Sequence, residues 1–231
     1  MHRVVIRIDG FKMKLTIIGI TGRMGQEVSK LLKPDEIAGG ISSGTPEEEF
    51  EKIIKNCSVA VDFSTPAVSI KAARYCAKHN IPLVCGTTGF SDEEFKQLKS
   101  FAEHTPILYA SNFSIGIFLM SKLIRMSEKV LDDFDISIID RHHNKKKDKP
   151  SGTTLFLASQ LEKTPQIASL RVGGVSGDHI CSFTGEDEEV TISHRSFSRR
   201  VFASGSVKCA FWLVSQKNGF YSLEDYLGAK K

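Results

Sequence analysis

Residues 140–154 carry a dense set of reactive side chains. They read DRHHNKKKDKPSGTT and include two histidines, four lysines and a Pro-Ser-Gly-Thr-Thr turn. Histidine moves protons near neutral pH and lysine pairs with anions, so these types suit a site for a negatively charged ligand. The alternative is a solvated basic loop, which is what most charge runs are.

The spacing within this segment brings two side chains together. Positions 142 and 146 share a face of an extended chain, and one helical turn would also bring them together. His142 and Lys146 can therefore point at one ligand. Three residues at an expected helix start offer hydroxyls and unpaired amides to a carboxylate: Ser151, Gly152 and Thr153. The other lysines of the run are expected to be solvated: Lys145, Lys147 and Lys149.

A second candidate site is the segment GITGRMG at 19–25, between an apolar run and an expected helix. Glycines there permit a tight turn and close backbone approach, so that a pyrophosphate can lie on the amides of the helix N-terminus. The spacing is GxxGxxG rather than the commoner GxGxxG, and a lone glycine pattern can be a plain turn. The flanking strand and helix, and an arginine able to meet phosphate, favour dinucleotide binding. The residues concerned are Gly19, Gly22, Arg23, Met24 and Gly25.

An acidic residue that would bind the adenosine ribose is not apparent about twenty positions later. The second expected strand ends instead at Ile41-Ser42-Ser43. Serines leave room for a 2′-phosphate, which a carboxylate would repel. Ser42 and Ser43 therefore favour NADPH, or the use of both NADPH and NADH.

Two further turns follow expected strands, GTTG at 86–89 and ASNFS at 110–114. Open α/β sheets bind ligands at the carboxyl ends of their strands, so both turns are candidates for the cofactor site. The alternative is a pair of well-made turns. His179 and His194 are expected to make structural hydrogen bonds, and the cysteines to fill the core.

The elements around these sites alternate between strands and helices. Short apolar runs predict five strands: 14–18, 36–41, 58–63, 81–85 and 106–110. Helices are expected to begin near Gly25, Thr45, Thr65 and Ser91, with Thr45 as an N-cap and Glu48 completing its capping box. This alternation implies right-handed βαβ units and an open, mostly parallel sheet.

The pattern changes after Asn112. A long amphipathic helix is expected at about 116–131, a strand at 135–140, the basic loop, and a helix from about Gly152. Three more strands are expected at 171–175, 179–185 and 189–195, and a helix at 207–216. The predicted fold class is α/β, a Rossmann-like parallel-sheet domain plus a second α+β domain. The expected domains are 13–112 with 200–231, and 113–199, after an extension at 1–12.

Composition excludes several classes of function. A formal charge of +4 over 231 residues is too small for a nucleic-acid footprint, yet it suits a small anionic ligand. The sequence contains no apolar run of the ~18 residues that a membrane span needs, so no membrane partner is expected. Five cysteines without a CxxC pair indicate neither a disulfide framework nor a zinc site. We therefore expect no metal, and a reducing cytoplasm fits best.

Taken together, the motifs resemble the dihydrodipicolinate reductase family, which makes tetrahydrodipicolinate for diaminopimelate and lysine biosynthesis. The resemblance runs from Met13 almost to the C-terminus. It rests on GRMG (22–25), DFSTP (62–66), GTTG (86–89), NFSIG (112–116), the HH pair with a lysine four residues after the first histidine, and PSGT (150–153). RVGGVSGDH (171–179) and SHRSFSRRVFASG (193–205) resemble later blocks of the family.

The resemblance implies reduction of 4-hydroxy-tetrahydrodipicolinate by NADPH or NADH. It also implies a small cyclic dicarboxylate as substrate and a homotetramer built by the sheet of the second domain. His142 would be the proton donor, and carboxylate contacts would come from His143, Lys146, Ser151, Gly152 and Thr153. Cofactor contacts beyond the glycine turn and the two serines would come from Phe63, Gly86, Thr87, Thr88, Ala110, Asn112 and Phe113.

The loop departs from the family at Asp140-Arg141, where glutamate and a small residue are usual, and at Lys149, where alanine is common. These positions lie outside the implied ligand set, so we expect them to change loop charge rather than chemistry. Two other classes stay open. A dinucleotide sensor would explain the glycine turn alone, and a different dehydrogenase would prefer a substrate with one carboxylate.

Overall fold

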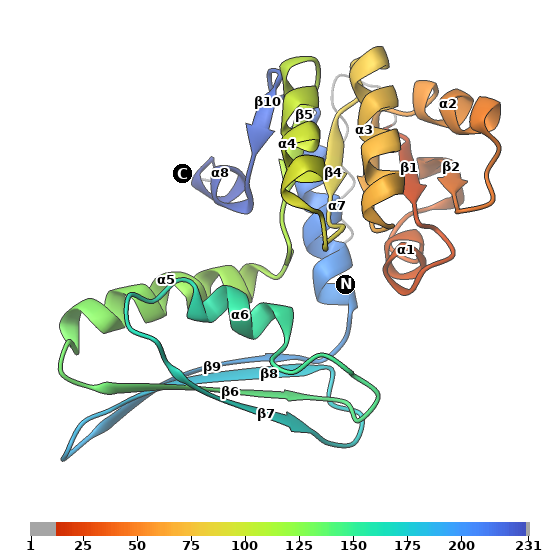
Figure 1. Ribbon diagram of the computed structural model, residues 1–231. Coiled ribbons are helices and arrows are strands. Elements are labelled where there is room, and N and C mark those ends of the chain that lie inside the picture. The colour runs from red at the N-terminus through yellow and green to blue at the C-terminus, as the bar shows by residue number, and fades with distance from the viewer. Residues whose placement is uncertain (1–12, 230–231) are drawn as a thin grey trace. The chain divides into compact units, whose positions relative to one another are not determined.

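The computed structural model describes residues 13–229, so the extension expected at 1–12 lies outside the described residues. The described chain divides into two compact units (Figure 1). Unit 1 comprises 13–113 and 202–229, and unit 2 is Ser114–Val201. Each unit has its own sheet and its own core.

Unit 1 is built on a six-stranded parallel sheet in the order β10-β5-β4-β3-β1-β2. Its strands are β1 (Leu15–Ile18), β2 (Ile37–Ile41), β3 (Val59–Asp62), β4 (Leu83–Cys85), β5 (Pro106–Tyr109) and β10 (Gly219–Tyr221). The strands β1, β3 and β4 are buried along their whole length, which explains their mostly apolar sequences. The predicted parallel sheet is confirmed.

Helices connect these strands. They are α1 (Arg23–Ser29), α2 (Glu47–Lys55), α3 (Pro66–His79), α4 (Asp92–Ser100), α7 (Arg200–Leu213) and α8 (Leu223–Gly228), with short 3-10 turns at Pro34–Glu36 and Phe101–Glu103. Side chains of α2, α3 and α4 form one apolar core with the sheet, including Phe50, Ile70, Cys76 and Leu98. Helix α4 begins where it was expected, with Ser91 as its N-cap, and the structure adds a capping box between Ser91 and Glu94.

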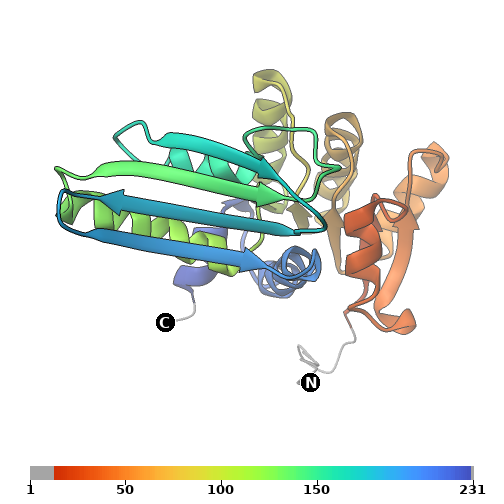
Figure 2. The same ribbon diagram turned by 90° about the horizontal axis from the view of Figure 1, so that it is seen from below.

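Unit 2 is a four-stranded mixed sheet in the order β7-β6-β8-β9. Its strands are β6 (Asp135–His142), β7 (Gln166–Arg171), β8 (Gly177–Thr184) and β9 (Glu189–Ser196). The helices α5 (Ile115–Val130) and α6 (Gly152–Ala158) lie on one face of this sheet (Figure 2). Ile117, Ile124, Ile138, Leu157 and Phe183 form the core between helices and sheet. The predicted second α+β domain is confirmed.

Three local predictions are wrong. The strand expected at 171–175 is β7 at Gln166–Arg171, and it is followed by a turn in which Gly173 has a φ of +50°. Pro46, not Thr45, is the N-cap of α2, because the Thr45 hydroxyl instead accepts a hydrogen bond from the Ser42 amide at 3.0 Å. The helix expected at 207–216 begins and ends earlier, as α7 at Arg200–Leu213. The sequence interpretation did not predict β10 and α8, which are short. All five cysteines are buried and free, as expected of core residues.

Candidate active site

The glycine turn after β1 has the tight geometry that its sequence predicts. Gly19 has a φ of +79°, and a Cβ there would lie 2.4 Å from the carbonyl oxygen of Phe63. A Cβ on Gly25 would lie 2.2 Å from the carbonyl oxygen of Gly19. Only glycine fits at both positions, because in each case the obstacle is backbone. These two glycines let α1 start directly against the end of β1.

Gly22 differs from its neighbours in the turn. It is the N-cap of α1, with an ordinary extended backbone, and a Cβ there would lie 3.1 Å from the Gly19 carbonyl oxygen, a tight contact that a small shift would relieve, and 4.0 Å from that of Phe63. Arg23 is exposed and Met24 is half-buried in the first turn of the helix. Gly22, Arg23 and Met24 therefore lie together at the start of α1, where the sequence predicts the pyrophosphate site.

The end of β2 lies beside this turn, since the Gly19 and Ile20 amides both donate to the Ile41 carbonyl oxygen, at 2.8 and 3.1 Å. Ser42 is the first residue after the strand, and Ser43 is exposed. The structure therefore ends β2 at Ile41, the position assumed in the prediction about NADPH and NADH. Serine, not a carboxylate, occupies the position after β2.

A buried carboxylate organises the ends of β3 and β4. Asp62 is fully buried at the end of β3 and accepts hydrogen bonds from the hydroxyls of Ser64, Ser69 and Thr87. The Thr87 hydroxyl also accepts from the Ser64 amide at 2.9 Å. Burial raises the pKa of Asp62 above its ordinary value, against the effect of these donors. The sequence interpretation did not single out this residue, although it begins the DFSTP motif.

The remaining expected cofactor residues divide by exposure. The Thr87 and Phe113 side chains are buried, so they can shape the site or offer backbone groups but do not present their side chains. The Phe113 ring packs edge-on against Phe63, with ring centroids 5.8 Å apart. A Cβ on Gly86 would lie 2.2 Å from the Phe63 ring. Thr88 is exposed, and Ala110 and Asn112 are half-buried after β5.

In unit 2, His142 is the last residue of β6 rather than a loop residue. Only 7% of it is exposed, and its Nδ1 is 3.9 Å from the nearer oxygen of Asp140, beyond hydrogen-bond distance. Burial lowers the pKa of His142 below its ordinary value, although the charge of Asp140 acts in the opposite direction. A Cβ on Gly177 of β8 would lie 3.2 Å from His142 Nε2, so this glycine leaves room for the imidazole.

Asp140, also fully buried on β6, connects the strand to the start of α6. It accepts hydrogen bonds from the Ser151 amide at 2.7 Å and the Thr154 hydroxyl at 2.9 Å, and it forms an ion pair with Arg171 at 2.8 Å. Burial opposes ionisation, but these donors outweigh it and hold the pKa of Asp140 well below its ordinary value. The expectation that Asp140 only changes loop charge is wrong, because its side chain is inside the unit.

The helix predicted from about Gly152 is confirmed as α6, but the Ser151 amide and hydroxyl that were expected to face a ligand are bonded to Asp140 and Thr154. Ser151 is the N-cap and accepts a hydrogen bond from the Thr154 amide at 3.2 Å. Gly152 is exposed, with no atom within 4 Å of where a Cβ would stand, and Thr153 is half-buried. Ser151 itself is buried, so its side chain fixes the helix start.

The lysines of the loop separate as expected. Lys145, Lys147 and Lys149 are exposed, whereas the Lys146 side chain is 23% exposed and its ammonium group donates to both oxygens of Asp148, at 2.8 and 2.7 Å. His143 is half-buried. Lys146 is therefore held in place by a carboxylate of the same loop.

Three histidine rings lie in a row across β6, β8 and β9. The centroids of His142 and His179 are 5.3 Å apart, and those of His179 and His194 are 6.5 Å apart. His179 Nε2 is 3.3 Å from the Ser151 hydroxyl and His194 Nε2 is 3.2 Å from the Ser114 hydroxyl, so both make the structural hydrogen bonds expected of them. Burial, reinforced by neighbouring His142, lowers the pKa of His179 to about 3. The sequence interpretation missed this proximity, which the strand register creates.

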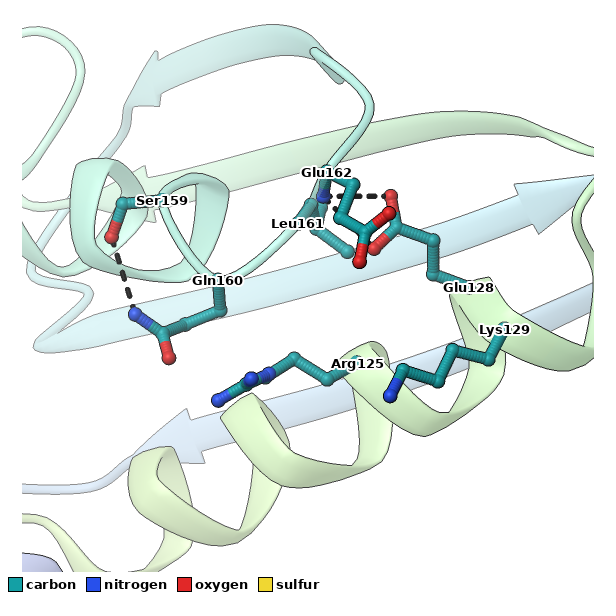
Figure 3. Close-up of a pocket in the computed structure, with 7 residues that line it drawn as sticks. All are labelled: Arg125, Glu128, Lys129, Ser159, Gln160, Leu161 and Glu162. Atoms are coloured by element: carbon teal, nitrogen blue, oxygen red, sulfur yellow. Dashed lines mark hydrogen bonds between the residues drawn. The ribbon is translucent and has the colours of Figure 1, made fainter.

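A separate cavity of about 270 Å³ lies in unit 2 beside α5 and the segment after α6 (Figure 3). Its lining residues are Arg125, Glu128, Lys129, Ser159, Gln160, Leu161 and Glu162. The Glu128 carboxylate already accepts hydrogen bonds from the backbone amides of Glu162 and Lys163. None of the expected site residues lines this cavity.

Within residues 13–229, no three histidine, cysteine or acidic side chains are grouped as a metal site would require. None of the helices in that range combines the length and apolar character needed to cross a membrane. A parallel sheet whose first turn is closed by glycines, together with a second unit built on a mixed sheet, places the chain in the class of two-domain proteins with a Rossmann-like fold.

The family descriptions "Dihydrodipicolinate reductase, N-terminus" and "Dihydrodipicolinate reductase, C-terminus" match residues 13–113 and 116–227. The chain belongs to the dihydrodipicolinate reductase family. The 4-hydroxy-tetrahydrodipicolinate reductase of Thermosipho africanus is 38% identical over 226 residues, which cover 93% of this chain and 98% of that protein. The protein of that name from Campylobacter lari is 36% identical over 240 residues, covering 94% and 99%. A dipicolinate-bound dihydrodipicolinate reductase from Paenisporosarcina sp. TG-14 has a TM-score of 0.74 and 25% identity, covering 93% of this chain and 99% of that one.

Proposed function

We propose that this chain catalyses the reduction of 4-hydroxy-tetrahydrodipicolinate to tetrahydrodipicolinate with NADPH or NADH, in which the 4-hydroxyl group leaves as water, a step of diaminopimelate and lysine biosynthesis. The observation that carries the proposal is in unit 2: buried His142 ends β6, and Lys146 lies on the segment that leads from β6 to the start of α6. His142, Lys146 and the first residues of α6 are the parts that a planar dicarboxylate requires. Nothing in a nucleotide sensor would need them.

The nicotinamide cofactor fits unit 1. Its pyrophosphate would lie on the first amides of α1, in front of Gly22, with Arg23 as an exposed cation beside it. Ser42 and Ser43 would lie near the adenosine ribose. The cofactor supplies the hydride when it is bound. The task of unit 1 is to orient it.

His142 is proposed as the proton donor. Burial lowers the pKa of His142, so at neutral pH its imidazole in the unliganded protein is neutral more often than that of an exposed histidine. A bound dianion would favour the imidazolium, so substrate binding would load the proton at the place where it is needed. The value of kcat/KM, which reports on the free enzyme, should accordingly fall as the pH rises above this lowered pKa.

Lys146 is proposed to hold one substrate carboxylate and to offset the negative charge that develops during the reaction. Its ammonium group pairs with exposed Asp148 in the structure, and a substrate carboxylate would compete with that pair. His143, Gly152 and Thr153 are proposed to bind the substrate carboxylates with it. Ser151 would contribute through the helix start that it caps, because its hydroxyl is already engaged.

We also propose that the protein is cytoplasmic and forms a homotetramer through the sheet of unit 2. The resemblance supports the assembly, and so does the position of α5 and α6 on one face of that sheet, with apolar Leu170 of β7 47% exposed. Light scattering coupled to size-exclusion chromatography would give the mass of the particle. A monomeric mass at working concentration would contradict the tetramer.

The activity is tested by following NADPH and NADH oxidation with freshly prepared 4-hydroxy-tetrahydrodipicolinate. Amino acids and 2-hydroxy acids serve as comparison substrates, in the oxidative direction with NAD⁺ or NADP⁺. We expect rapid oxidation of NADPH or NADH with the cyclic dicarboxylate, and no turnover of the comparison substrates. Turnover of a monocarboxylate instead would identify a different dehydrogenase, and nucleotide binding without any turnover would identify a sensor.

A further inference from the structure

Unit 2 contains two carboxylate–arginine clusters, and one of them contacts both the loop that carries Lys146 and the start of α6. Arg171, at the end of β7, donates to Asp140 at 2.8 Å and also to the backbone carbonyl of Asp148. Its side chain is only 6% exposed and that of Asp140 is fully buried. The pair therefore lies beneath the loop.

The contacts of this pair lead to both proposed anion-binding elements. Through the Ser151 amide and the Thr154 hydroxyl, Asp140 fixes the first turn of α6. Through the Asp148 carbonyl, Arg171 fixes the loop residue whose carboxylate holds the Lys146 ammonium group. Both anion-binding elements are thus attached to one buried ion pair.

We propose that Asp140 and Arg171 are positioning residues that hold the Lys146 loop and the start of α6 at a fixed separation, which selects a rigid dicarboxylate over a monocarboxylate. The inference rests on the proposed function, since it assumes that these two elements bind the two carboxylates. A flexible loop loses conformational entropy when a ligand orders it, and this loss weakens binding. A loop already held in place avoids the loss and therefore binds a rigid ligand of matching span more tightly. A ligand with one carboxylate gains much less from the fixed separation.

The second cluster provides a matched control. Asp178 on β8 is 3% exposed and pairs with Arg141 and Arg195, each at 3.2 Å. It is also a buried carboxylate between arginines on the same sheet. The Asp178 carboxylate bonds to those arginines and its charge also acts on His194, rather than on the 143–150 loop or α6. Asp178→Asn therefore removes a comparable charge without releasing either anion-binding element.

The test is isothermal titration of the NADPH-loaded protein with pyridine-2,6-dicarboxylate and with pyridine-2-carboxylate. The measured quantity is the ratio of the two dissociation constants. Asp140→Asn should reduce the preference for the dicarboxylate by roughly tenfold or more, whereas Asp178→Asn should leave it within about twofold of the wild type. Substrate KM should rise more than kcat falls, and NADPH affinity should be unchanged in both variants.

If Asp140→Asn does not fold, Arg171→Lys keeps the charge at that position but loses the planar fork that spans Asp140 and the Asp148 carbonyl, and it should show the same loss of preference. A wild-type ratio in whichever of these variants folds would overturn the inference while leaving the proposed function intact. A wild-type protein that binds both pyridine acids equally would instead contradict the proposed function itself.

Discussion

Replacing Gly22 with valine should weaken both nicotinamide nucleotides while leaving unit 1 folded. Gly22 has a φ of −75° and a ψ of 164°, a backbone that valine adopts readily. A Cβ there would lie 3.1 Å from the Gly19 carbonyl oxygen and 4.0 Å from that of Phe63, so the fold needs a shift of only a few tenths of an ångström. We expect a loss of folding stability of about 1 kcal/mol at most.

The nucleotide would lose more, because the valine methyl groups stand where the pyrophosphate approaches the amides of α1. A hydrogen bond to a charged group contributes about 1.5–3 kcal/mol, so the loss of one corresponds to roughly a ten- to hundredfold rise in the dissociation constant. The rise should be similar for NADPH and NADH, since both carry the pyrophosphate. Fluorescence titration of the reduced nucleotides measures both constants.

Two other glycine substitutions serve as comparisons. Gly44→Val, at an exposed position with no atom within 4 Å of its Cβ, should leave both constants unchanged. Gly19→Ala should destabilise the fold itself by roughly 2–4 kcal/mol, because the new Cβ meets backbone at 2.4 Å and the φ is +79°. Unchanged nucleotide affinity in folded Gly22→Val would refute the placement of the pyrophosphate at this turn.

Three further predictions concern other parts of the site. His142→Gln should lower kcat by roughly 10²–10⁴-fold with little change in substrate affinity, whereas Lys146→Ala should worsen both kcat and KM, as steady-state kinetics would show. Ser42→Asp or Ser43→Asp should weaken NADPH selectively, by repulsion of its 2′-phosphate, and equal effects on the two nucleotides in a titration would argue against that placement. His179 has a pKa of about 3 in the folded protein and about 6.5 in the unfolded chain, so the unfolded state binds the extra proton between these values. The free energy of unfolding should therefore fall as the pH drops below about 6.5, by up to ~1.4 kcal/mol per pH unit. Denaturant titrations at several pH values should show that this free energy depends less steeply on pH in His179→Gln than in the wild type.

Much of the fold could be predicted from sequence because the buried parallel strands are mostly apolar runs that alternate with helix-start signals such as Pro66 and Ser91. The strand β7 could not, since it lies at the edge of its sheet and most of its residues are exposed, including Leu170. The RVGGV segment offered stronger β-branched character but contains the turn at Gly173. The prediction of a strand at 171–175 followed local β propensity. In the structure, pairing with β6 instead places the strand at Gln166–Arg171.

For the candidate site, spacing was sufficient to select His142 and Lys146 but not to find what supports them. Asp140 was treated as a loop residue, although the alternation of Ile136, Ile138, Asp140 and His142 places all four on one face of β6. That alternation was the available signal. The contact between His142 and His179 depends on the register of β6 against β8, which pairs Asp140 with His179 and which no local pattern specifies.

The most direct test uses NADPH carrying two deuterium atoms at C4 of the nicotinamide, incubated with the protein and freshly prepared 4-hydroxy-tetrahydrodipicolinate. Mass spectrometry of the product then reports whether a hydride from the cofactor reached the substrate. We predict tetrahydrodipicolinate with one carbon-bound deuterium per molecule, formed much more slowly by His142→Gln. Product without deuterium, or no reduced product from the wild-type protein, would contradict the assignment of this chain as the reductase.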